Sequence, residues 1–296
     1  MSGMREHGAP RRIAIVTCAE HPRLYGDEQA VITSLGDVGV EASAVVWSDG
    51  DVRWSDFDRV VLRSTWDYFE RIDDFVRWLD LIEQQQIELY NPVRLVRWNL
   101  DKRYLAELEA RGVPIIPTRF IAAGERMDVS SYVRSLGWSE VILKPAISGA
   151  ALRTYRRDGR DAASIQSAFD EIAATTTVLI QPFAPEIERE GEWSLVFFGG
   201  AFSHAVVKTP KPGDFRVQTQ FGGTFRAVTP PPSLLDAARA IIAMLPAAPV
   251  YVRIDGIVRD DRFLLMEVEA IEPYLYMSGV PDALRRYIDA IGGPPG

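Results

Sequence analysis

The chain has 296 residues, of which 47% are hydrophobic and 25% charged, so it is long enough for two or three small domains. Its 33 basic and 41 acidic residues give a net charge of −8, which argues against nucleic acid or an anionic membrane as a partner. No apolar run approaches the roughly 18 residues of a membrane-spanning helix, so we expect a cytoplasmic protein. A homodimer is compatible with the sequence.

Strand and helix patterns alternate between residues 12 and 98. The predicted strands are 12–17, 41–47 and 59–64, and the predicted helices are 27–37 and 73–85. Such alternation favours an open α/β domain with a mostly parallel sheet. The chain lacks both Gly-x-Gly-x-x-Gly after its first strand and Gly-x-x-x-x-Gly-Lys-Ser/Thr, so neither a dinucleotide site nor a P-loop is supported.

A second unit follows a predicted helix that starts near Leu100 and that Gly112 ends. Apolar runs and helical spacing predict a small α+β domain here. Its elements are a strand at 118–123, a helix at 128–137, a strand at 140–145, a loop of small residues at 146–151, a helix at 161–174 and a strand at 177–183.

The last third of the chain predicts a β-rich unit that ends in a hairpin. Its elements are strands at 192–198 and 202–208 around a Gly199-Gly200 turn, a segment 216–221 that ends at Gly222-Gly223, a helix at 234–244, and the hairpin at 250–269.

This hairpin places Asp255, Glu267 and Glu269 within strand patterns. Alternation leaves these acids opposite the apolar faces, and it puts Leu264, Met266 and Val268 together on one face. A three-residue loop at 260–262 then sets the register. That register pairs Arg259 with Phe263, Asp255 with Glu267, and Arg253 with Glu269.

Two carboxylates that face each other need a positive partner, because opposed like charges destabilise a sheet. One candidate is arginine, with Arg253 pairing with Glu269 and Arg259 turning inward. The other candidate is Mg²⁺, which takes oxygen ligands from a few carboxylates and completes its shell with water and phosphate. The residues of the hairpin alone leave both open.

Lysine is rare in this chain: Lys102, Lys144, Lys208 and Lys211 stand against 29 arginines. Since arginine serves the general surface, a lysine that is kept suggests a site for a compact point charge, such as a phosphate site.

The order of these parts resembles the ATP-grasp superfamily, and most of all its glutathione-synthetase-type ligases. The resemblance covers nearly the whole chain, with motifs between about residues 91 and 273. It implies an ATP-grasp fold in three parts: an N-terminal α/β domain at 1–98, a lid and central domain at 99–183, and a C-terminal domain with the metal site at 184–296. The implied cofactors are ATP and Mg²⁺, with two ions expected.

The resemblance implies a nucleotide site in the middle of the chain. Two lysines would hold phosphates, a small-residue loop would cover them, a hinge would recognise adenine through its backbone, and one of two glutamates would accept from the ribose hydroxyls. In that order, the matching residues are Lys102 and Lys144, then Ser148 and Gly149, then Gln181 to Phe183, and Glu192 or its competitor Glu188.

The same resemblance implies the catalytic and metal residues. Lys208 and Arg216 match the cations around the transferred phosphoryl group, where charge stabilisation provides most of the catalysis. Gly223 matches a turn at which the backbone approaches substrate. The implied Mg²⁺ ligands are Asp255, Glu267 and Glu269, the last standing where relatives more often have asparagine.

A substrate site is expected where the third predicted strand ends, since α/β sheets present ligand groups at carboxyl ends. Arg63 would bind a carboxylate, Trp66 would form a wall and Asp67 would hold an ammonium group, or all three would belong to a domain interface. Tyr274 and Tyr276 would either line the same cavity or pack. The expected substrate is small and resembles an amino acid.

The resemblance implies an ATP-dependent carboxylate–amine ligase that forms an amide-type bond through an acyl phosphate. The two groups belong either to two molecules or to one, as in the cyclo-ligases that convert O-ureido-D-serine to D-cycloserine. Two alternatives stay open at this point: a phosphotransferase on the same scaffold, and a nucleotide-binding protein without turnover.

Overall fold

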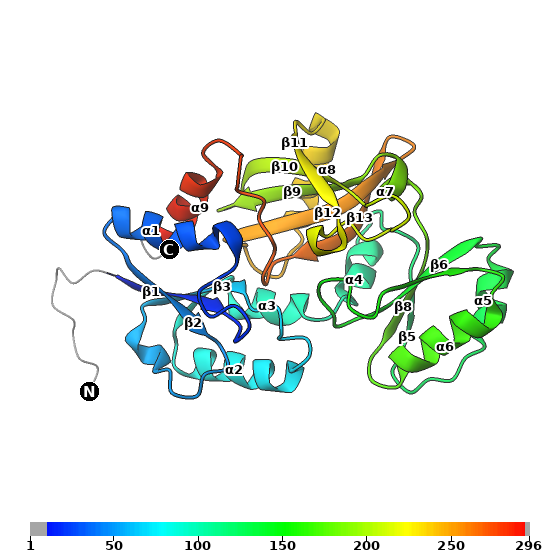
Figure 1. Cartoon of the computed structure of the whole chain (residues 1–296), viewed down its shortest axis with the longest axis horizontal. Coiled ribbons are helices and arrows are strands. Elements are labelled where there is room, and N and C mark those ends of the chain that lie inside the picture. The colour runs from blue at the N-terminus through cyan, green and yellow to red at the C-terminus, as the bar shows by residue number, and fades with distance from the viewer. Residues whose placement is uncertain (1–10, 294–296) are drawn as a thin grey trace.

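The computed structural model describes residues 11–293, which fold into a mixed α/β structure with three sheets. Figure 1 shows the N-terminal sheet and the sheet of the middle segment at opposite ends of the molecule, with the strands of the last third above and between them. The predicted α/β class is confirmed. Within the described residues, no helix combines the length and apolar character that crossing a bilayer requires.

The N-terminal sheet is parallel, with strand order β2-β1-β3-β4. Helix α2 covers one face with buried Phe75, Trp78 and Leu79, while α1 covers the other face with Val31 and Leu35. The predicted parallel sheet is therefore confirmed. Its elements are β1 (Arg12–Thr17), α1 (Gln29–Asp37), β2 (Glu41–Val46), β3 (Arg59–Ser64), α2 (Ile72–Gln84) and β4 (Glu88–Tyr90).

The middle segment contains an antiparallel sheet of order β5-β8-β6-β7, whose core is formed with α5 and α6. We call this sheet with its two helices the lid. Ahead of it, the single helix predicted from Leu100 is two helices, because residues 100–103 form a turn. The elements are α3 (Val93–Asn99), α4 (Tyr104–Ala110), β5 (Arg119–Ile121), α5 (Val129–Ser135), β6 (Glu140–Pro145), β7 (Tyr155–Asp158), α6 (Ala162–Ala173) and β8 (Val178–Pro182).

The last third forms a five-stranded antiparallel sheet of order β11-β10-β9-β12-β13. The segment 216–221 is loop and a short 3-10 turn, and the edge strand β11 follows the glycine pair. The elements are α7 (Glu186–Arg189), β9 (Glu192–Phe198), β10 (Ala201–Thr209), β11 (Thr224–Val228), α8 (Pro232–Ile242), β12 (Tyr251–Arg259), β13 (Arg262–Glu269) and α9 (Ala283–Gly292).

The turn of the final hairpin differs from the prediction. It has two residues, Asp260 and Asp261, both with positive φ, so Arg259 faces Arg262 and the predicted Arg259–Phe263 pair is wrong. A β-bulge then inserts one extra residue, Met266, into β13. The turn is one residue shorter than predicted and the bulge adds one residue to β13, so the two differences cancel for the pairs beyond the bulge.

Beyond the bulge, the predicted register holds: Asp255 faces Glu267, and Arg253 faces Glu269. The bulge also changes which side chains share a face. Val268 packs in the core of the five-stranded sheet, whereas Leu264 and Met266 pack around Ile257 on the cavity side. The prediction that all three share a face is wrong, because an inserted residue reverses the alternation.

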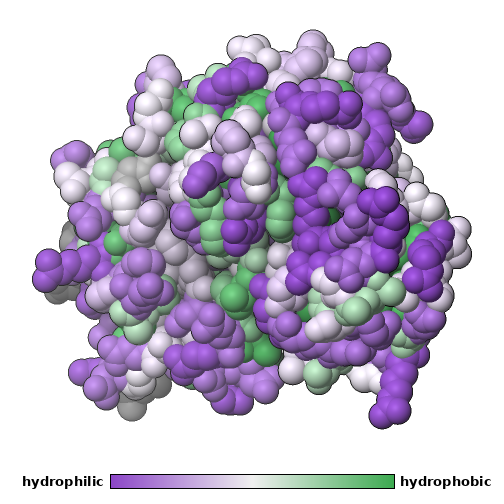
Figure 2. Space-filling model, turned by 45° about the vertical axis from the view of Figure 1, so that its right-hand side comes forward, coloured by the Kyte–Doolittle hydropathy of each residue, from purple (hydrophilic) through white to green (hydrophobic). Residues whose placement is uncertain are grey.

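Two helices join parts that lie far apart in the sequence. Helix α4 packs with α8 on the five-stranded sheet, and the last helix, α9, packs against α1 of the N-terminal part. The boundaries of the three predicted domains stay a prediction. Hydrophilic side chains cover most of the face drawn in Figure 2, as the net charge leads one to expect.

Candidate active site

A cavity of about 610 Å³ takes its wall from all three sheets and their loops. All but four of the predicted site residues line it. Those that do are Trp66, Lys102, Lys144, Ser148, Gly149, Gln181, Phe183, Glu192, Lys208, Arg216, Asp255, Glu267 and Glu269.

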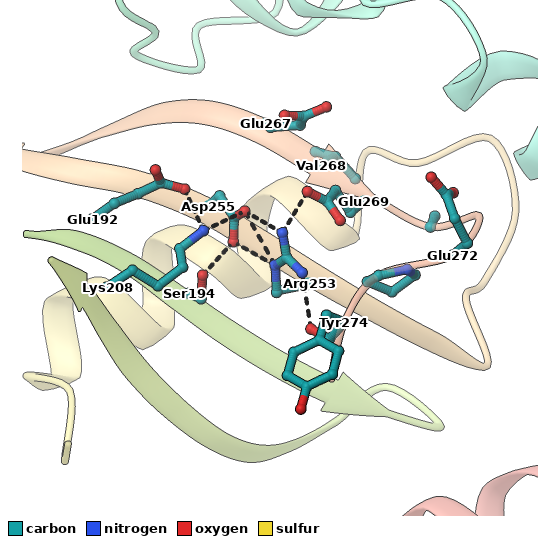
Figure 3. Close-up of polar contacts among 12 residues, drawn as sticks. Glu192, Ser194, Lys208, Arg253, Asp255, Glu267, Val268, Glu269, Glu272 and Tyr274 are labelled. Carbon is teal, nitrogen blue, oxygen red and sulfur yellow. Dashed lines mark hydrogen bonds and ion pairs between the residues drawn. The ribbon is translucent and has the colours of Figure 1, made fainter. Parts of the chain in front are cut away.

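A cluster of charged side chains, which we call the cavity network, forms one wall (Figure 3). It consists of Glu192, Lys208, Arg253, Asp255 and Glu269. Arg253 donates from Nε to Asp255 Oδ1 at 2.9 Å and from Nη2 to Oδ2 at 2.8 Å, and it also pairs with Glu269. Lys208 Nζ lies 3.1 Å from Asp255 Oδ2 and 2.5 Å from Glu192 Oε1.

The charges of this network depend on one another. Burial alone would raise the pKa of Asp255, but Arg253 and Lys208 hold that pKa well below its usual range. Burial would likewise lower the pKa of Lys208, and Asp255 and Glu192 raise it instead. The opposed carboxylates of the hairpin are thus balanced mainly by positive side chains of the protein itself. The predicted Arg253–Glu269 pair is present, whereas Arg259 pairs with Glu186.

The two lysines of the lid side differ in their partners. Lys102 Nζ donates to the Ser148 carbonyl at 2.6 Å and lies 3.1 Å from Glu267 Oε1. Lys144 lines the cavity from β6, and its ammonium forms no hydrogen bond or ion pair within residues 11–293. Burial lowers the pKa of Lys144. An ammonium group in this state is a ready partner for an anion such as a phosphate.

Two acids of the cavity wall, Glu269 and Glu272, are less well compensated than Asp255. Burial raises the pKa of Glu269 to about 7, against the opposing effect of Arg253. Burial, followed by the nearby charge of Glu269, raises the pKa of Glu272 to about 8. An additional cation in this part of the cavity would therefore be stabilised.

The predicted metal ligands fit Mg²⁺ only in part. Among the described residues, no three His, Cys, Asp or Glu side chains are arranged around one metal position. Asp255 does not fit as it stands, because both its oxygens already accept hydrogen bonds from Ser194, Arg253 and Lys208. Glu267 and Glu269 do fit, since they lie at alternate positions of β13 and both line the cavity. Glu267 and Glu269 are therefore the carboxylates more open to a metal ion, and the ligand set of three stays a prediction.

The predicted adenine hinge also needs a correction. The Phe183 N–H donates to the Glu140 carbonyl at 3.0 Å, so it is not available to a base. The next N–H, that of Ala184, makes no hydrogen bond with the described residues, although Ala184 is buried at the cavity wall. Gln181 uses its side chain to donate to Thr118 Oγ1 at 2.8 Å. The N–H that is open to a ligand therefore lies one residue beyond the predicted hinge.

Four predicted site residues do not line the cavity. Glu188 pairs with Arg156 on the lid, which leaves Glu192 as the acid at the cavity. Asp67 accepts a hydrogen bond from Trp47 Nε1 at 2.7 Å. Both side chains thus have structural partners, and the predicted role of Asp67 as the ammonium partner is not supported.

The predicted substrate contacts of Arg63 and Gly223 are not supported, and the reasons differ. Arg63 is fully buried against Glu28 and the Pro273 carbonyl, which keeps it away from a substrate carboxylate. Gly223 allows a close approach, but the neighbour is protein: a Cβ there would lie 2.2 Å from the Val217 carbonyl oxygen. This glycine therefore shapes the loop that carries Arg216 and Val217 over the cavity.

Several cavity residues were not predicted. The sequence pattern predicts Arg253 only as a partner of Glu269, although this arginine stands two residues before Asp255. Others give no sequence signal of their own. These are the aromatic side chains of His21 and Tyr25 and the carboxylate of Glu272, while Tyr274 and Tyr276 line the cavity as one of the two interpretations allowed.

Three sheets around a cavity, with lysines from the lid side facing acids of a final hairpin, define an ATP-grasp protein. The D-alanine–D-alanine ligase from Bacillus anthracis superposes with a TM-score of 0.70 at 16% identity, over 95% of this chain and 96% of that one. Its complex with ATP gives a TM-score of 0.68 at 18% identity. These likenesses show the fold, and the predicted ATP-grasp class is confirmed together with the more similar D-cycloserine synthetase structure described next.

More similar relatives define the family. Residues 13–91 match the family model described as the N-terminal domain of D-cycloserine synthetase DcsG. The cycloserine biosynthesis protein DcsG of Streptomyces lavendulae is 36% identical over 203 residues, which are 66% of this chain and 67% of that protein. The crystal structure of D-cycloserine synthetase DcsG superposes with a TM-score of 0.84 at 30% identity, over 95% of this chain and 98% of that one.

A glutathione synthetase from Ralstonia nicotianae is 27% identical over 232 residues, 76% of this chain and 68% of that protein. The chain belongs to the D-cycloserine synthetase family of the ATP-grasp superfamily. It is an ATP-dependent ligase that joins a carboxylate to an amine.

Proposed function

We propose that this ligase closes a ring within one small amino-acid-like molecule, and that O-ureido-D-serine is its substrate. The carboxylate attacks the γ-phosphorus of ATP, so that ADP leaves and an acyl phosphate forms. The nitrogen bonded to oxygen then attacks the acyl carbon, loses its proton and displaces phosphate. Hydrolytic loss of the carbamoyl group, as carbon dioxide and ammonia, completes D-cycloserine.

The observation that carries the proposal is the likeness to D-cycloserine synthetase DcsG over 95% of the chain. The unpaired ammonium of Lys144, in the same cavity as the cavity network, supports the use of ATP. Lys102 and Lys144 would hold the nucleotide phosphates. Lys208, Arg216 and Arg253 would stabilise charge on the transferred phosphoryl group, which is the main task of the protein in phosphoryl transfer.

Other cavity residues would bind the nucleoside. Phe183 and Ala184 would border adenine, and Glu192 would accept from the ribose. The loop that holds Ser148 and Gly149 would cover the phosphates and exclude water from the acyl phosphate. Gly149 is suited to this place, because a Cβ there would lie 2.5 Å from the Phe69 ring.

Glu267 and Glu269 would hold Mg²⁺ together with the nucleotide phosphates. When bound, this ion neutralises phosphate charge and orients the terminal phosphate for in-line attack. A second ion, which the resemblance implies, would use the same two carboxylates.

The test is an ADP-release assay with O-ureido-D-serine, D-serine and D-alanine, combined with mass analysis of products. We expect ADP with O-ureido-D-serine alone and a product with the mass of D-cycloserine. An intermolecular ligase would instead require two substrates, and a phosphotransferase would leave a stable phosphorylated product. Either result would overturn ring closure.

A pair of variants tests the site. Glu267→Gln should lower ADP formation at least about a thousandfold, because a charged ligand of the nucleotide complex is lost. Glu188→Gln is the matched control, since this acid lies outside the cavity, and it should keep activity within about twofold. Near-normal turnover of Glu267→Gln would contradict the assignment.

A further inference from the structure

Among the described residues, Glu272 is the one acid of the cavity wall that is at least partly buried and forms no ion pair. It follows β13, lines the cavity and is partly buried. Asp255, Glu192 and Glu269 contact cations of the cavity network, and Glu267 contacts Lys102.

Within residues 11–293 the Glu272 carboxylate forms no ion pair, and its own backbone N–H is the donor that approaches it. In Figure 3 this carboxylate lies apart from the dashed contacts of the cavity network. Glu20, a further acid of the cavity wall, is exposed, so water solvates its charge. The cavity thus has one partly desolvated carboxylate that lacks a counterion.

Aromatic rings line the same cavity, and one of them contacts the backbone of Glu272. His21, Tyr25 and Trp66 contact one another with ring centroids 5.1 to 5.6 Å apart, and all three line the cavity. Trp66 Nε1 donates to the Glu272 carbonyl at 3.2 Å, which fixes the rings to the backbone of Glu272. Aromatic faces beside a carboxylate favour an organic cation.

We propose that the Glu272 carboxylate binds the α-ammonium group of the substrate, with the rings of His21, Tyr25 and Trp66 around it. The inference rests on the proposed function and assigns one end of the same site. In an α-amino acid the ammonium nitrogen is one carbon away from the carboxyl carbon. Glu272 lies close enough to Glu269, Lys102 and Glu267 for their charges to act on it, so the carboxyl carbon would lie at the phosphates.

A divalent cation is the other ion that a lone carboxylate attracts. The described residues offer no arrangement of three metal-binding side chains at Glu272. An ammonium group needs no such set, because one carboxylate and neighbouring π faces satisfy it.

This pairing has a chemical consequence for selectivity. A nitrogen held as ammonium has no free lone pair and does not attack an acyl phosphate. The nitrogen bonded to oxygen is then the nucleophile that remains, so ring closure is favoured over coupling of two substrate molecules through the α-amine.

The test compares two probes in wild type and in Glu272→Gln, which keeps the shape of the side chain but removes its charge. The probes are O-ureido-D-serine and its analogue without the α-amine, 3-(ureidooxy)propanoic acid, and ADP release gives kcat and KM. In wild type, loss of the amine should lower kcat/KM at least about tenfold. Glu272→Gln should lose at least about tenfold with O-ureido-D-serine, mainly in KM, and stay within about twofold with the analogue.

Three controls support the comparison. Glu20→Gln should retain the wild-type preference for the amine. Glu272→Asp retains the charge and should retain the preference with a higher KM. Binding of a non-hydrolysable ATP analogue by Glu272→Gln should stay within about twofold of wild type, which shows that the nucleotide end is intact.

The inference is overturned if Glu272→Gln still prefers the amine as wild type does, or if it loses equally with both probes. Loss of the preference in Glu20→Gln would also overturn it. If wild type released no ADP with O-ureido-D-serine or with the analogue, that result would instead contradict the proposed function itself.

Discussion

Arg63 and Arg253 are both buried and both paired with carboxylates, but they lie in different parts of the molecule. Arg63 is fully buried, pairs with Glu28 and lies 5.7 and 5.4 Å from the rings of Tyr251 and Tyr287. Arg253 is 5% exposed and pairs with Asp255 and Glu269. Arg63 does not line the cavity, whereas Arg253 does.

The two networks also differ in their balance of charge. We call Glu28, Arg63 and Ser64 the core network: one carboxylate accepts from both other side chains, so it holds one anion for one cation. The cavity network has three acids for two cations, and Glu267 and Glu272 lie nearby. Burial and ion pairing are therefore shared by both regions, and only contact with the cavity together with surplus acid distinguishes the region that we propose to bind ligands.

The largest expected effect comes from removing the central acid of the cavity network. Asp255→Asn should lower ADP formation at least about a thousandfold, because Arg253 and Lys208 lose the anion that positions both of them. Initial rates of ADP release measure this. The melting temperature should fall only moderately, since Glu192 and Glu269 still compensate both cations. A variant with more than a tenth of wild-type activity would contradict the comparison.

Loss of the acid of the core network should lower the stability of the protein and leave its activity nearly unchanged. Glu28→Gln leaves the Arg63 charge buried without an anion, which should cost about 3 kcal/mol of the free energy of unfolding. Urea denaturation measures the loss, and kcat at a temperature where the variant is folded should stay within about threefold. A stable Glu28→Gln with low kcat would show that the core network acts in the reaction after all.

The sequence predicted the class of the fold because the order of strands, helices and motifs is local information. Most of the predicted site residues line the cavity for the same reason, since Lys102, Lys144 and the final acids lie in recognisable segments. The predicted substrate role of Arg63 is not supported, because an arginine near a strand end has the same sequence pattern whether it contacts a substrate or a buried carboxylate such as Glu28. Only packing with Glu28 and the C-terminal segment decides between them.

Glu272 was missed for a related reason. A single glutamate after a strand belongs to no motif. A role in binding can be inferred only from the neighbours that the fold brings to it, which are Trp66 and the nearby acids. The hairpin register was predicted correctly at Asp255 although the turn was not. A two-residue turn with a bulge at Met266 gives the same pairing as a three-residue loop, and the alternation of apolar residues does not separate the two.

Lys144 gives a prediction of intermediate size on the cavity side. Because its ammonium is partly desolvated and without a partner, Lys144→Met should raise the stability of the nucleotide-free protein by about 1 kcal/mol. The same variant should lose the rise in melting temperature that a non-hydrolysable ATP analogue gives to wild type. Thermal unfolding with and without the analogue measures both effects.

The gain from Lys144→Met should also depend on pH. Burial lowers the pKa of Lys144 from 10.5, so the folded protein releases this proton more readily than the unfolded chain does. The penalty for the buried charge is largest while Lys144 is protonated in both states, and it disappears as pH rises through the lowered pKa toward 10.5. The stability difference between variant and wild type should therefore narrow from pH 7 to pH 10, and a constant difference would mean that lost charge is not the cause.

The smallest expected effect lies at the far end of the strands that carry the cavity network. Asp260 and Asp261 occupy the two-residue turn with φ values of 51° and 58°, a backbone region in which glycine is less strained. Asp261→Gly should therefore raise the free energy of unfolding by about 0.5 kcal/mol, because relief of the turn slightly exceeds the entropy lost by glycine on folding. Both aspartates are exposed and neither lines the cavity, so kcat and KM should not change. If this variant altered KM, strain in the turn would have to reach Arg253 along β12, and the separation between structural and ligand-binding regions would not hold.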